Sequence, residues 1–345
     1  MRNAKMILLV LLLNLLVIGT CQGYAASPAL RGIFEVVWGP KLYQTAGLKF
    51  AYIDGITLYI AWNEVEPEEG QYRWEVIDEA LKRAQAENKI LNIGVFPNFR
   101  APKFVFDAGV ATFDHTKWAQ HDGVRTVVKA PLPWDPVYIA KWKDFIKALA
   151  KRYDGENKLG YIALTGPNLQ AVEMSINLQD EDDLSKFKAA GFSNETLIKA
   201  WKEVIDCYEQ NFKTAKSALI MGLVQKDIFP AQEIARYAAQ KLGNRFVVKM
   251  AFLNGKWFQT MKPKNPNYQL IELLKSYSGT HDMGMEMFWK SSFRDGERNG
   301  PLDVAIQNGI KNKAKFVEIY RDDIEEDGKP NASFERILKE YHSRF

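Results

Sequence analysis

Short runs of β-branched and aromatic residues alternate along the chain with longer segments whose apolar residues recur every three to four positions. The first pattern predicts buried strands, and the second predicts amphipathic helices. The expected strands are Gly32–Trp38, Gly55–Ala61, Ile90–Phe96, Tyr161–Thr165, Ala218–Val224, Phe246–Phe252, Met283–Trp289 and Lys315–Tyr320. The expected helices are Leu42–Ala46, Glu75–Glu87, Val137–Tyr153, Glu195–Asn211, Ala231–Leu242, Tyr268–Ser276, Leu302–Ile310 and Ser333–His342.

Eight alternations of strand and helix predict parallel strands that are joined by crossover helices. Eight strands close a (β/α)8 barrel, or TIM barrel, whose active site lies where the carboxyl ends of the strands meet the following loops. An open, doubly wound sheet is less favoured, because no G-x-G-x-x-G or P-loop motif follows any strand. No repeat or linker interrupts the pattern, so we predict an α/β fold with one barrel domain over residues 26–345.

The first 25 residues have a composition of their own. Arg2 and Lys5 precede the apolar run Met6–Ile18, which is too short to span a bilayer and is typical of a secretory signal. We therefore expect residues 1–25 to be a signal peptide and the mature protein to be secreted, periplasmic or held at the cell surface. Cys21 stands in a segment that approximates a lipoprotein signal, although Thr20 replaces the usual Gly or Ala. A lipid anchor at Cys21 is the only membrane contact we expect.

Charge and motif content exclude several classes of partner and cofactor. The chain of 345 residues has a formal net charge of +4 and no dense block of Lys or Arg, so we expect no nucleic-acid partner. The four histidines show no metal-binding spacing, and no G-x-S-x-G motif occurs. We expect neither a metal nor an organic cofactor. The sequence does not determine the oligomeric state.

The most specific motif, W-N-E-V-E-P-E-E-G-Q-Y-R-W, begins at Trp62, directly after the second expected strand. It resembles the W-x-x-x-E-P-x-x-G-x-Y-x-W segment of clan-A glycoside hydrolases, the β-galactosidase-like TIM-barrel enzymes of the family 42 type. The run Pro97–Phe104 resembles the substrate loop after the third strand of these enzymes, and Ala150–Tyr153 resembles the end of the helix before their fourth strand. The resemblance covers about residues 55–168.

This resemblance implies a glycosidase that acts on a carbohydrate with two carboxyl groups, at the ends of strands four and seven. On strand seven, Glu286 is a lone carboxylate in an apolar run, which is costly to bury unless it faces a polar site. The resemblance implies that Glu286 is the nucleophile; the alternative is a structural carboxylate that is paired with a neighbouring Lys or Arg. After strand four, the family pattern would place the acid directly after Asn168, but Leu169 stands there. The next carboxylate, Glu173, is the expected acid/base.

Two further charges lie in apolar strands. Glu318 and Tyr320 share one face of the last strand, so Glu318 could bind sugar hydroxyls, replace one catalytic acid or form a structural ion pair. Lys249 is explained equally well by pairing with a carboxylate on a neighbouring strand. The expected substrate-binding residues are Asn168, Glu318, Tyr320, Trp289, Trp62, Glu64, Phe99 and Arg100.

The residues leave the reaction and the function open. Carboxyl groups of Glu173 and Glu286 roughly 5–5.5 Å apart would predict retention of anomeric configuration, and a gap of roughly 6.5–9.5 Å would predict inversion. The motifs after the second and third strands resemble those of retaining enzymes, which favours retention. Because of Leu169, the alternative function is a catalytically inactive carbohydrate-binding TIM barrel. A third is an interaction protein on the same scaffold.

Overall fold

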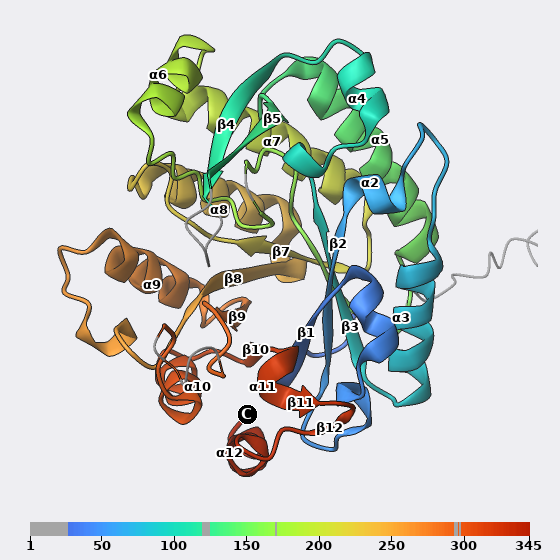
Figure 1. Cartoon of the computed structure of the whole chain (residues 1–345), viewed down its shortest axis with the longest axis vertical. Helices are drawn as coiled ribbons and strands as arrows, with labels where there is room; N and C mark the ends of the chain where they lie inside the picture. Colours follow the sequence, from blue (N-terminus) through green and yellow to red (C-terminus); the bar gives the residue numbers. More distant parts are fainter. Residues whose placement is uncertain (1–26, 119–124, 170, 293–295, 297) are drawn as a thin grey trace, which may run out of the picture.

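A closed barrel of parallel strands forms the centre of the computed structural model, in the order β1-β10-β9-β8-β7-β6-β3-β2 (Figure 1). The structure describes residues 27–345 except 119–124, 170, 293–295 and 297. The expected signal peptide and Cys21 lie outside the described residues. The barrel strands are β1 (Gly32–Trp38), β2 (Gly55–Ala61), β3 (Ile90–Phe96), β6 (Leu159–Ala163), β7 (Lys216–Ile220), β8 (Phe246–Leu253), β9 (Asp282–Met287) and β10 (Phe316–Tyr320). The predicted (β/α)8 barrel is confirmed.

The chain forms helices between the strands, and the longer of these helices cover the outside of the barrel (Figure 1). They are α2 (Trp62–Val65), α3 (Glu75–Ala86), α4 (Lys103–Asp107), α5 (Pro136–Tyr153), α6 (Glu181–Ala189), α7 (Asn194–Asn211), α8 (Phe229–Leu242), α9 (Pro266–Tyr277), α10 (Leu302–Lys311), α11 (Arg321–Ile324) and α12 (Glu335–His342). The predicted segment Leu42–Ala46 is a 3-10 helix over Gly39–Gln44. Within the described residues, no helix is long and apolar enough to cross a membrane.

The first three barrel strands have the predicted bounds, but several later strands end early. β6 ends at Ala163, β7 at Ile220 and β9 at Met287, before the ends that the apolar runs predict. The runs continue because the residues after the sheet stay buried: Leu164 and Met221 are at most 2% exposed. Apolar character therefore marks the buried segment, and the sheet hydrogen bonds stop inside it.

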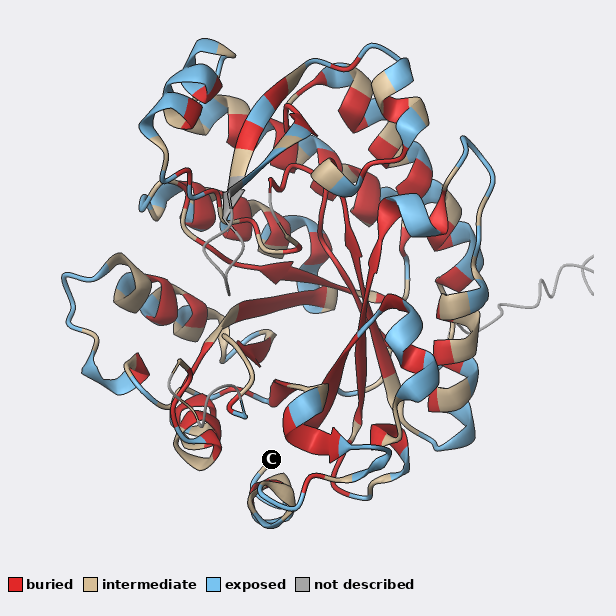
Figure 2. Cartoon of the chain, in the orientation of Figure 1, coloured by how far each residue is buried: buried red, intermediate tan, exposed pale blue. Residues whose placement is uncertain are grey.

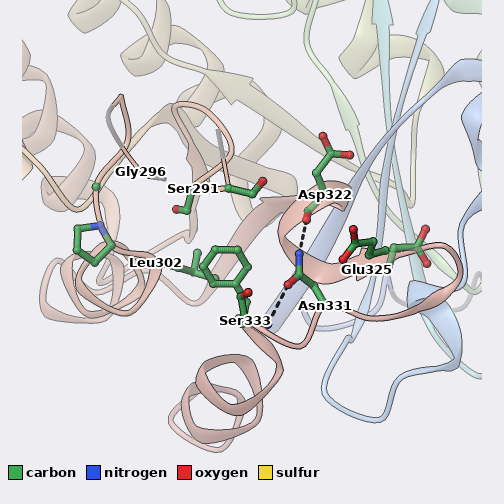
Figure 3. Close-up of a pocket in the computed structure, with 12 residues that line it drawn as sticks. Ser291, Gly296, Leu302, Asp322, Glu325, Asn331 and Ser333 are labelled. Atoms are coloured by element: carbon green, nitrogen blue, oxygen red, sulfur yellow. Dashed lines mark hydrogen bonds between the residues drawn. The ribbon is translucent and has the colours of Figure 1, made fainter. Parts of the chain in front are cut away.

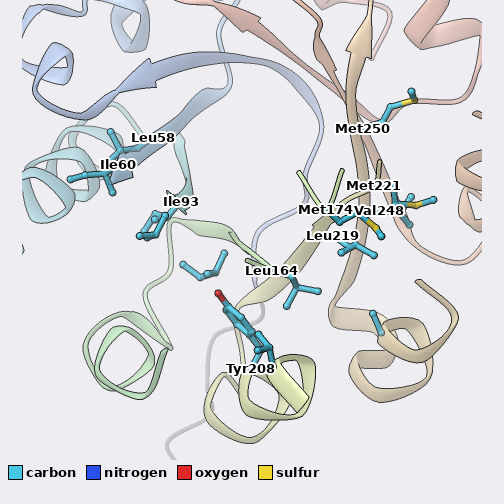
Figure 4. Close-up of a cluster of buried hydrophobic side chains, with 14 of the residues drawn as sticks. Leu58, Ile60, Ile93, Leu164, Met174, Tyr208, Leu219, Met221, Val248 and Met250 are labelled. Carbon is cyan, nitrogen blue, oxygen red and sulfur yellow. The ribbon is translucent and has the colours of Figure 1, made fainter. Parts of the chain in front are cut away.

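Two apolar layers hold the barrel together. The larger layer fills the space between strands and helices, and Figure 4 shows part of it. The smaller one fills the barrel interior with residues at alternate strand positions, among them Phe34, Val36, Tyr59, Phe96, Tyr161, Ala163, Ala218, Ile220, Val247 and Phe316. Buried residues dominate the strands, and exposed ones lie on the outer helix faces (Figure 2). This division is the one expected of a barrel core.

The two longest insertions at the carboxyl ends of the strands follow β3 and β6, and both contain elements that the sequence pattern did not predict. The loop after β3 carries α4 and an antiparallel hairpin of β4 (Thr112–Trp118) and β5 (Arg125–Pro131). The loop after β6 carries α6. The backbone N–H of Thr116 in β4 donates to Asp183 of α6 at 2.7 Å, and Nδ1 of His115 lies 3.5 Å from the same carboxylate. The two insertions therefore pack against each other.

Candidate active site

The motif after β2 stabilises a loop. Nε1 of Trp62 donates to Oε2 of Glu66 at 2.8 Å, and the N–H of Gly70 donates to Oε1 of Glu66 at 2.9 Å. The Trp62 side chain is completely buried, and its ring contacts that of Trp142 edge to face, with 4.8 Å between centroids. The prediction that Trp62 binds substrate is wrong, because its indole packs against α5 and presents no surface to a ligand.

Two carboxylates from neighbouring strands meet one lysine inside the barrel. Glu286 of β9 and Glu318 of β10 are paired in register. Nζ of Lys249, on β8, lies 2.7 Å from Oε2 of Glu286, is ion-paired with Glu318 and donates to Oη of Tyr59 at 2.7 Å. The two carboxylates and the lysine are at most 2% exposed. Buried charges need such pairing, so the structure shows the ion-pair alternative for both Glu318 and Lys249.

Two tyrosine hydroxyls complete this network. Tyr59 of β2 donates to Oε2 of Glu286 at 2.6 Å, and Tyr161 of β6 donates to Oε1 of Glu318. The Tyr59 ring lies over Gly94 of β3, where a Cβ would come within 2.5 Å of the ring. The glycine therefore gives the ring its space. The sequence analysis missed both tyrosines because they read as apolar, and their inward-facing strand positions were the only available signal.

Burial and the neighbouring charges set the protonation of Glu286. Burial raises the pKa of Glu286 to about 7, with the Lys249 ammonium opposing the shift and the charges of Glu318 and Glu173 adding to it. Burial also disfavours the charged form of Lys249, but Glu286 and then Glu318 hold the pKa of this ammonium well above its ordinary value. Oε1 of Glu286 accepts no hydrogen bond from the residues that the structure describes. This oxygen is the one that can meet a substrate.

Asn168 shapes the loop that follows β6. Its Oδ1 accepts from the N–H of Gly166 at 2.6 Å, and its Nδ2 donates to the carbonyl oxygens of Val172 and Glu173, each at 2.8 Å. Asn168 is completely buried. Its amide is fully used by its own loop, so the predicted contact with substrate is wrong and the side chain positions the backbone of Glu173.

Glu173 returns over the barrel beside β7. The N–H of the next residue, Met174, donates to the carbonyl of Ile220 at 3.0 Å, which ties the loop to the end of β7. Burial raises the pKa of the half-buried Glu173 side chain. Its charge in turn raises the pKa of Glu286. The catalytic roles of Glu173 and Glu286 stay predictions.

Tyr320 and Trp289 form an aromatic pair beside the carboxylates. Tyr320 ends β10, Trp289 follows β9, and their ring centroids are 5.3 Å apart. Burial, followed by the charges of Glu286 and Glu173, raises the pKa of the Tyr320 hydroxyl well above its ordinary value. Trp289 therefore packs against a tyrosine whose hydroxyl is influenced by the candidate catalytic carboxylates, and substrate binding by both residues stays a prediction.

The remaining substrate-binding candidates lie at the ends of β2 and β3. The exposed Glu64 accepts a hydrogen bond through Oε2 from the N–H of Ala61 at 3.2 Å. Arg100 is exposed, and its guanidinium carbon lies 5.3 Å from the ring centroid of Phe99. They lie at the carboxyl end of the barrel, the end at which TIM-barrel active sites occur. Substrate contact by these three residues stays a prediction.

A separate polar cavity of about 740 Å³ lies between α11, β12 (Lys329–Pro330) and the start of α10 (Figure 3). Nδ2 of Asn331 donates to the carbonyl of Asp322 at 2.8 Å, and the N–H of Ser333 donates to Oδ1 of Asn331 at 3.0 Å. Glu325 accepts from a backbone N–H at 2.6 Å. None of the predicted site residues lines this cavity.

The barrel fold and the paired carboxyl groups near the carboxyl ends of its strands resemble the arrangement in clan-A glycoside hydrolases. Residues 42–164 match the family model described as Beta-galactosidase. This match confirms the resemblance that the sequence analysis drew from about residues 55–168. No curated protein sequence matches the chain.

Solved structures with a similar fold include three glycosidases. The catalytic domain of β-amylase from Paenibacillus polymyxa has a TM-score of 0.58 at 11% identity, covering 92% of this chain and 99% of that one. The catalytic domain of the major endoglucanase from Xanthomonas campestris pv. campestris has a TM-score of 0.56 at 10% identity, covering 93% and 98%. The β-galactosidase from Marinomonas ef1 has a TM-score of 0.55 at 9% identity, covering 90% of this chain but 59% of that one. At these identities the likeness shows the fold, and with the family match it supports a glycosidase.

Proposed function

We propose that the protein is an exported glycoside hydrolase that cleaves O-glycosidic bonds of an oligo- or polysaccharide with retention of anomeric configuration. The family match and the barrel support a glycosidase. The observation that supports the mechanism best is the geometry of Glu286, whose Oε2 accepts from Tyr59 and Lys249 while Oε1 has no donor among the described residues. The leader-like residues 1–25 support export.

The proposed reaction has two steps. In the first, Oε1 of Glu286 attacks the anomeric carbon while Glu173 donates its proton to the leaving oxygen, which gives a glycosyl ester on Glu286. In the second, Glu173 takes a proton from water, the water oxygen attacks the anomeric carbon, and the ester bond breaks. Tyr59 and Lys249 both bond to Oε2 of Glu286, so they hold this carboxylate with Oε1 free to react.

This mechanism requires opposite protonation states of the two carboxyl groups. Glu286 must be ionised to attack, and its pKa is about 7, so kcat/KM should rise with pH through about 7. Glu173 must be protonated to act as the acid. Burial raises its pKa, so it keeps its proton to a higher pH than an exposed glutamate does. Activity should fall once Glu173 loses that proton. The resulting bell-shaped pH profile of kcat/KM reports apparent pKa values of the interacting pair, not of either group alone.

A screen of nitrophenyl glycosides and of plant and microbial polysaccharides tests the proposal. The wild type should turn over at least one substrate, and Glu286→Gln should abolish turnover with the fold intact. The exposed Glu68→Gln is the matched control and should keep full activity. Azide should rescue Glu286→Gly, and proton NMR of the first product should show the anomer of the substrate. Wild-type rates in the Glu286→Gln variant would remove this residue from the mechanism.

Leu169 supports a second candidate function. It is completely buried at the position where the family pattern would place the acid. If Glu173 does not replace that acid, the protein is a carbohydrate-binding barrel without catalysis. The same screen separates the functions: sugar binding without turnover supports the binding protein, and neither binding nor turnover supports an interaction protein.

Export is tested separately. The N-terminal sequence of the protein recovered outside the cytoplasm should begin after about residue 25 if the leader is a simple signal peptide. If Cys21 carries a lipid, the protein should stay in the membrane fraction, and Cys21→Ala should release it. Retention of residues 1–25 on a cytoplasmic protein would contradict export.

A further inference from the structure

An exposed tryptophan ends β1. Trp38 is 41% exposed, although it is the last residue of a strand whose other residues are buried. It follows Phe34 and Val36 at alternate positions, and these two side chains lie inside the barrel. The Trp38 side chain therefore continues the inner face of β1 to the carboxyl end of the barrel. The ring is exposed at the end of the barrel where TIM-barrel active sites lie, which makes it a candidate surface for binding a ligand.

Packing fixes the orientation of this ring. Trp38 stacks on Phe96 of β3, with 4.9 Å between ring centroids and 17° between ring planes. Tyr59 contacts it from β2 at 5.4 Å and 53°. Phe96 and Tyr59 are themselves at most 7% exposed, so the surfaces against which Trp38 rests do not move freely. A preformed aromatic surface loses little conformational entropy when a ligand binds.

The ring is continuous with the candidate active site. Trp38 and Tyr59 are paired in register, and the Tyr59 hydroxyl donates to Glu286 at 2.6 Å. One side chain thus separates the exposed ring from the candidate nucleophile. Next to Trp38, a Cβ on Gly39 would lie 3.3 Å from Oε2 of Glu64, which places this exposed carboxylate at the edge of the aromatic surface.

We propose that Trp38, with Glu64 at its edge, forms a subsite that binds a second pyranose ring of an oligosaccharide whose neighbouring sugar lies at Glu286. The C–H groups on one face of a pyranose match the apolar ring of Trp38, and the hydroxyl groups at its rim match a carboxylate acceptor. The subsite rests on the proposed glycosidase function, because it identifies the substrate as a chain that extends from the reacting sugar towards β1.

Steady-state kinetics of the full mature protein on substrates of different length tests this subsite. The substrates are an aryl monoglycoside and oligosaccharides of two to five units of the sugar that the wild type cleaves. Trp38→Ala should lower kcat/KM about tenfold on the oligosaccharides, mainly through KM, and less on the monoglycoside. Trp38→Phe should recover most of the loss. Phe229→Ala removes another exposed aromatic ring, 46% exposed at the start of α8, and should match the wild type throughout.

Calorimetric titration with the same oligosaccharides separates failure of the subsite from failure of the glycosidase. An active wild type with an unchanged Trp38→Ala variant overturns the subsite and leaves the glycosidase standing. A wild type that binds oligosaccharides without turnover, and binds them about tenfold more weakly as Trp38→Ala, supports the subsite and refutes the glycosidase. Absence of both turnover and binding overturns both. If Trp38→Ala differs from the wild type only in its oligomeric state, the ring contacts another protein chain, and the subsite is overturned.

Discussion

Glu35 of β1 is a buried carboxyl group outside the candidate site, and its replacement by glutamine should change how stability depends on pH. It points away from the barrel interior and is completely buried. Thr45 donates to its Oε1, while Oε2 has no hydrogen-bond partner among the described residues. Burial raises the pKa of Glu35 to about 8; Thr45 and Arg321 oppose the shift, and the charge of Glu325 adds to it.

The size and sign of the effect follow from this pKa. In the unfolded chain the carboxyl group has its ordinary pKa of 4.5, and in the folded protein about 8. Below pH 4.5 both states hold the proton, so its contribution to stability is fully present there. Between these values the unfolded state loses the proton first, and stability falls by about 1.4 kcal/mol per pH unit. Above pH 8 the accumulated loss is on the order of 5 kcal/mol.

Glu35→Gln has no proton to lose, so its stability relative to the wild type should increase with pH. Urea unfolding at pH 4.5, 6, 7.5 and 9 measures the difference between their free energies of unfolding. This difference should be small at pH 4.5 and should reach several kcal/mol, up to about 5, at pH 9. Glu87→Gln, an exposed carboxylate at the end of α3, is the control and should show no such trend. Equal pH dependence in Glu35→Gln and the wild type would refute the reasoning.

Three further predictions concern the site. Lys249→Met leaves two buried carboxylates without their cation, so the free energy of unfolding in urea should fall by about 3–5 kcal/mol. The acid limb of the pH profile of kcat/KM should also move to higher pH, and an unmoved limb would contradict the role of this ammonium. Gly94→Ala pushes on the Tyr59 ring and should cost about 1–3 kcal/mol by the same measurement, together with a lower kcat. Asn168→Ala frees the backbone of Glu173 and should lower kcat about 10–100-fold with little change in KM. A change in KM alone would instead indicate that the Asn168 side chain contacts the substrate.

Much of the fold was readable because the apolar runs are short, numerous and bounded by polar or glycine residues. The first three strands have the predicted ends, although burial continues just beyond β2 at Trp62 and beyond β3 at Asn98. Beyond Ala163 and Ile220 burial continues without the sheet, so the same signal overshoots. The hairpin β4–β5 was missed because its alternating residues lie inside a long polar loop, where a two-stranded ribbon leaves a weak apolar pattern.

The charged residues of the barrel interior were readable because each of them interrupts an apolar strand. Glu286, Glu318 and Lys249 are such charges, and strand alternation placed them inside the barrel, but it could not say which would pair. Which of these charges pair depends on which strands are adjacent in the closed sheet, and only the strand order determines that. Trp62 was misassigned because a motif resemblance locates a loop but not the side to which its indole points. Trp38 drew no attention because an aromatic residue at a strand end is expected to be buried.

The contact between the two insertions has a consequence for how this barrel can change its ligand. Asp183 of α6 binds the hairpin backbone at Thr116, and the Phe187 ring of α6 contacts that of Phe113 at 4.9 Å between centroids. Replacing either insertion alone would strip the other of its partner and expose a buried aromatic face. The two loops therefore form a single exchangeable unit, although they follow different strands. Grafting or recombination that respects only loop boundaries should yield unstable proteins, and exchanging both together should preserve the barrel.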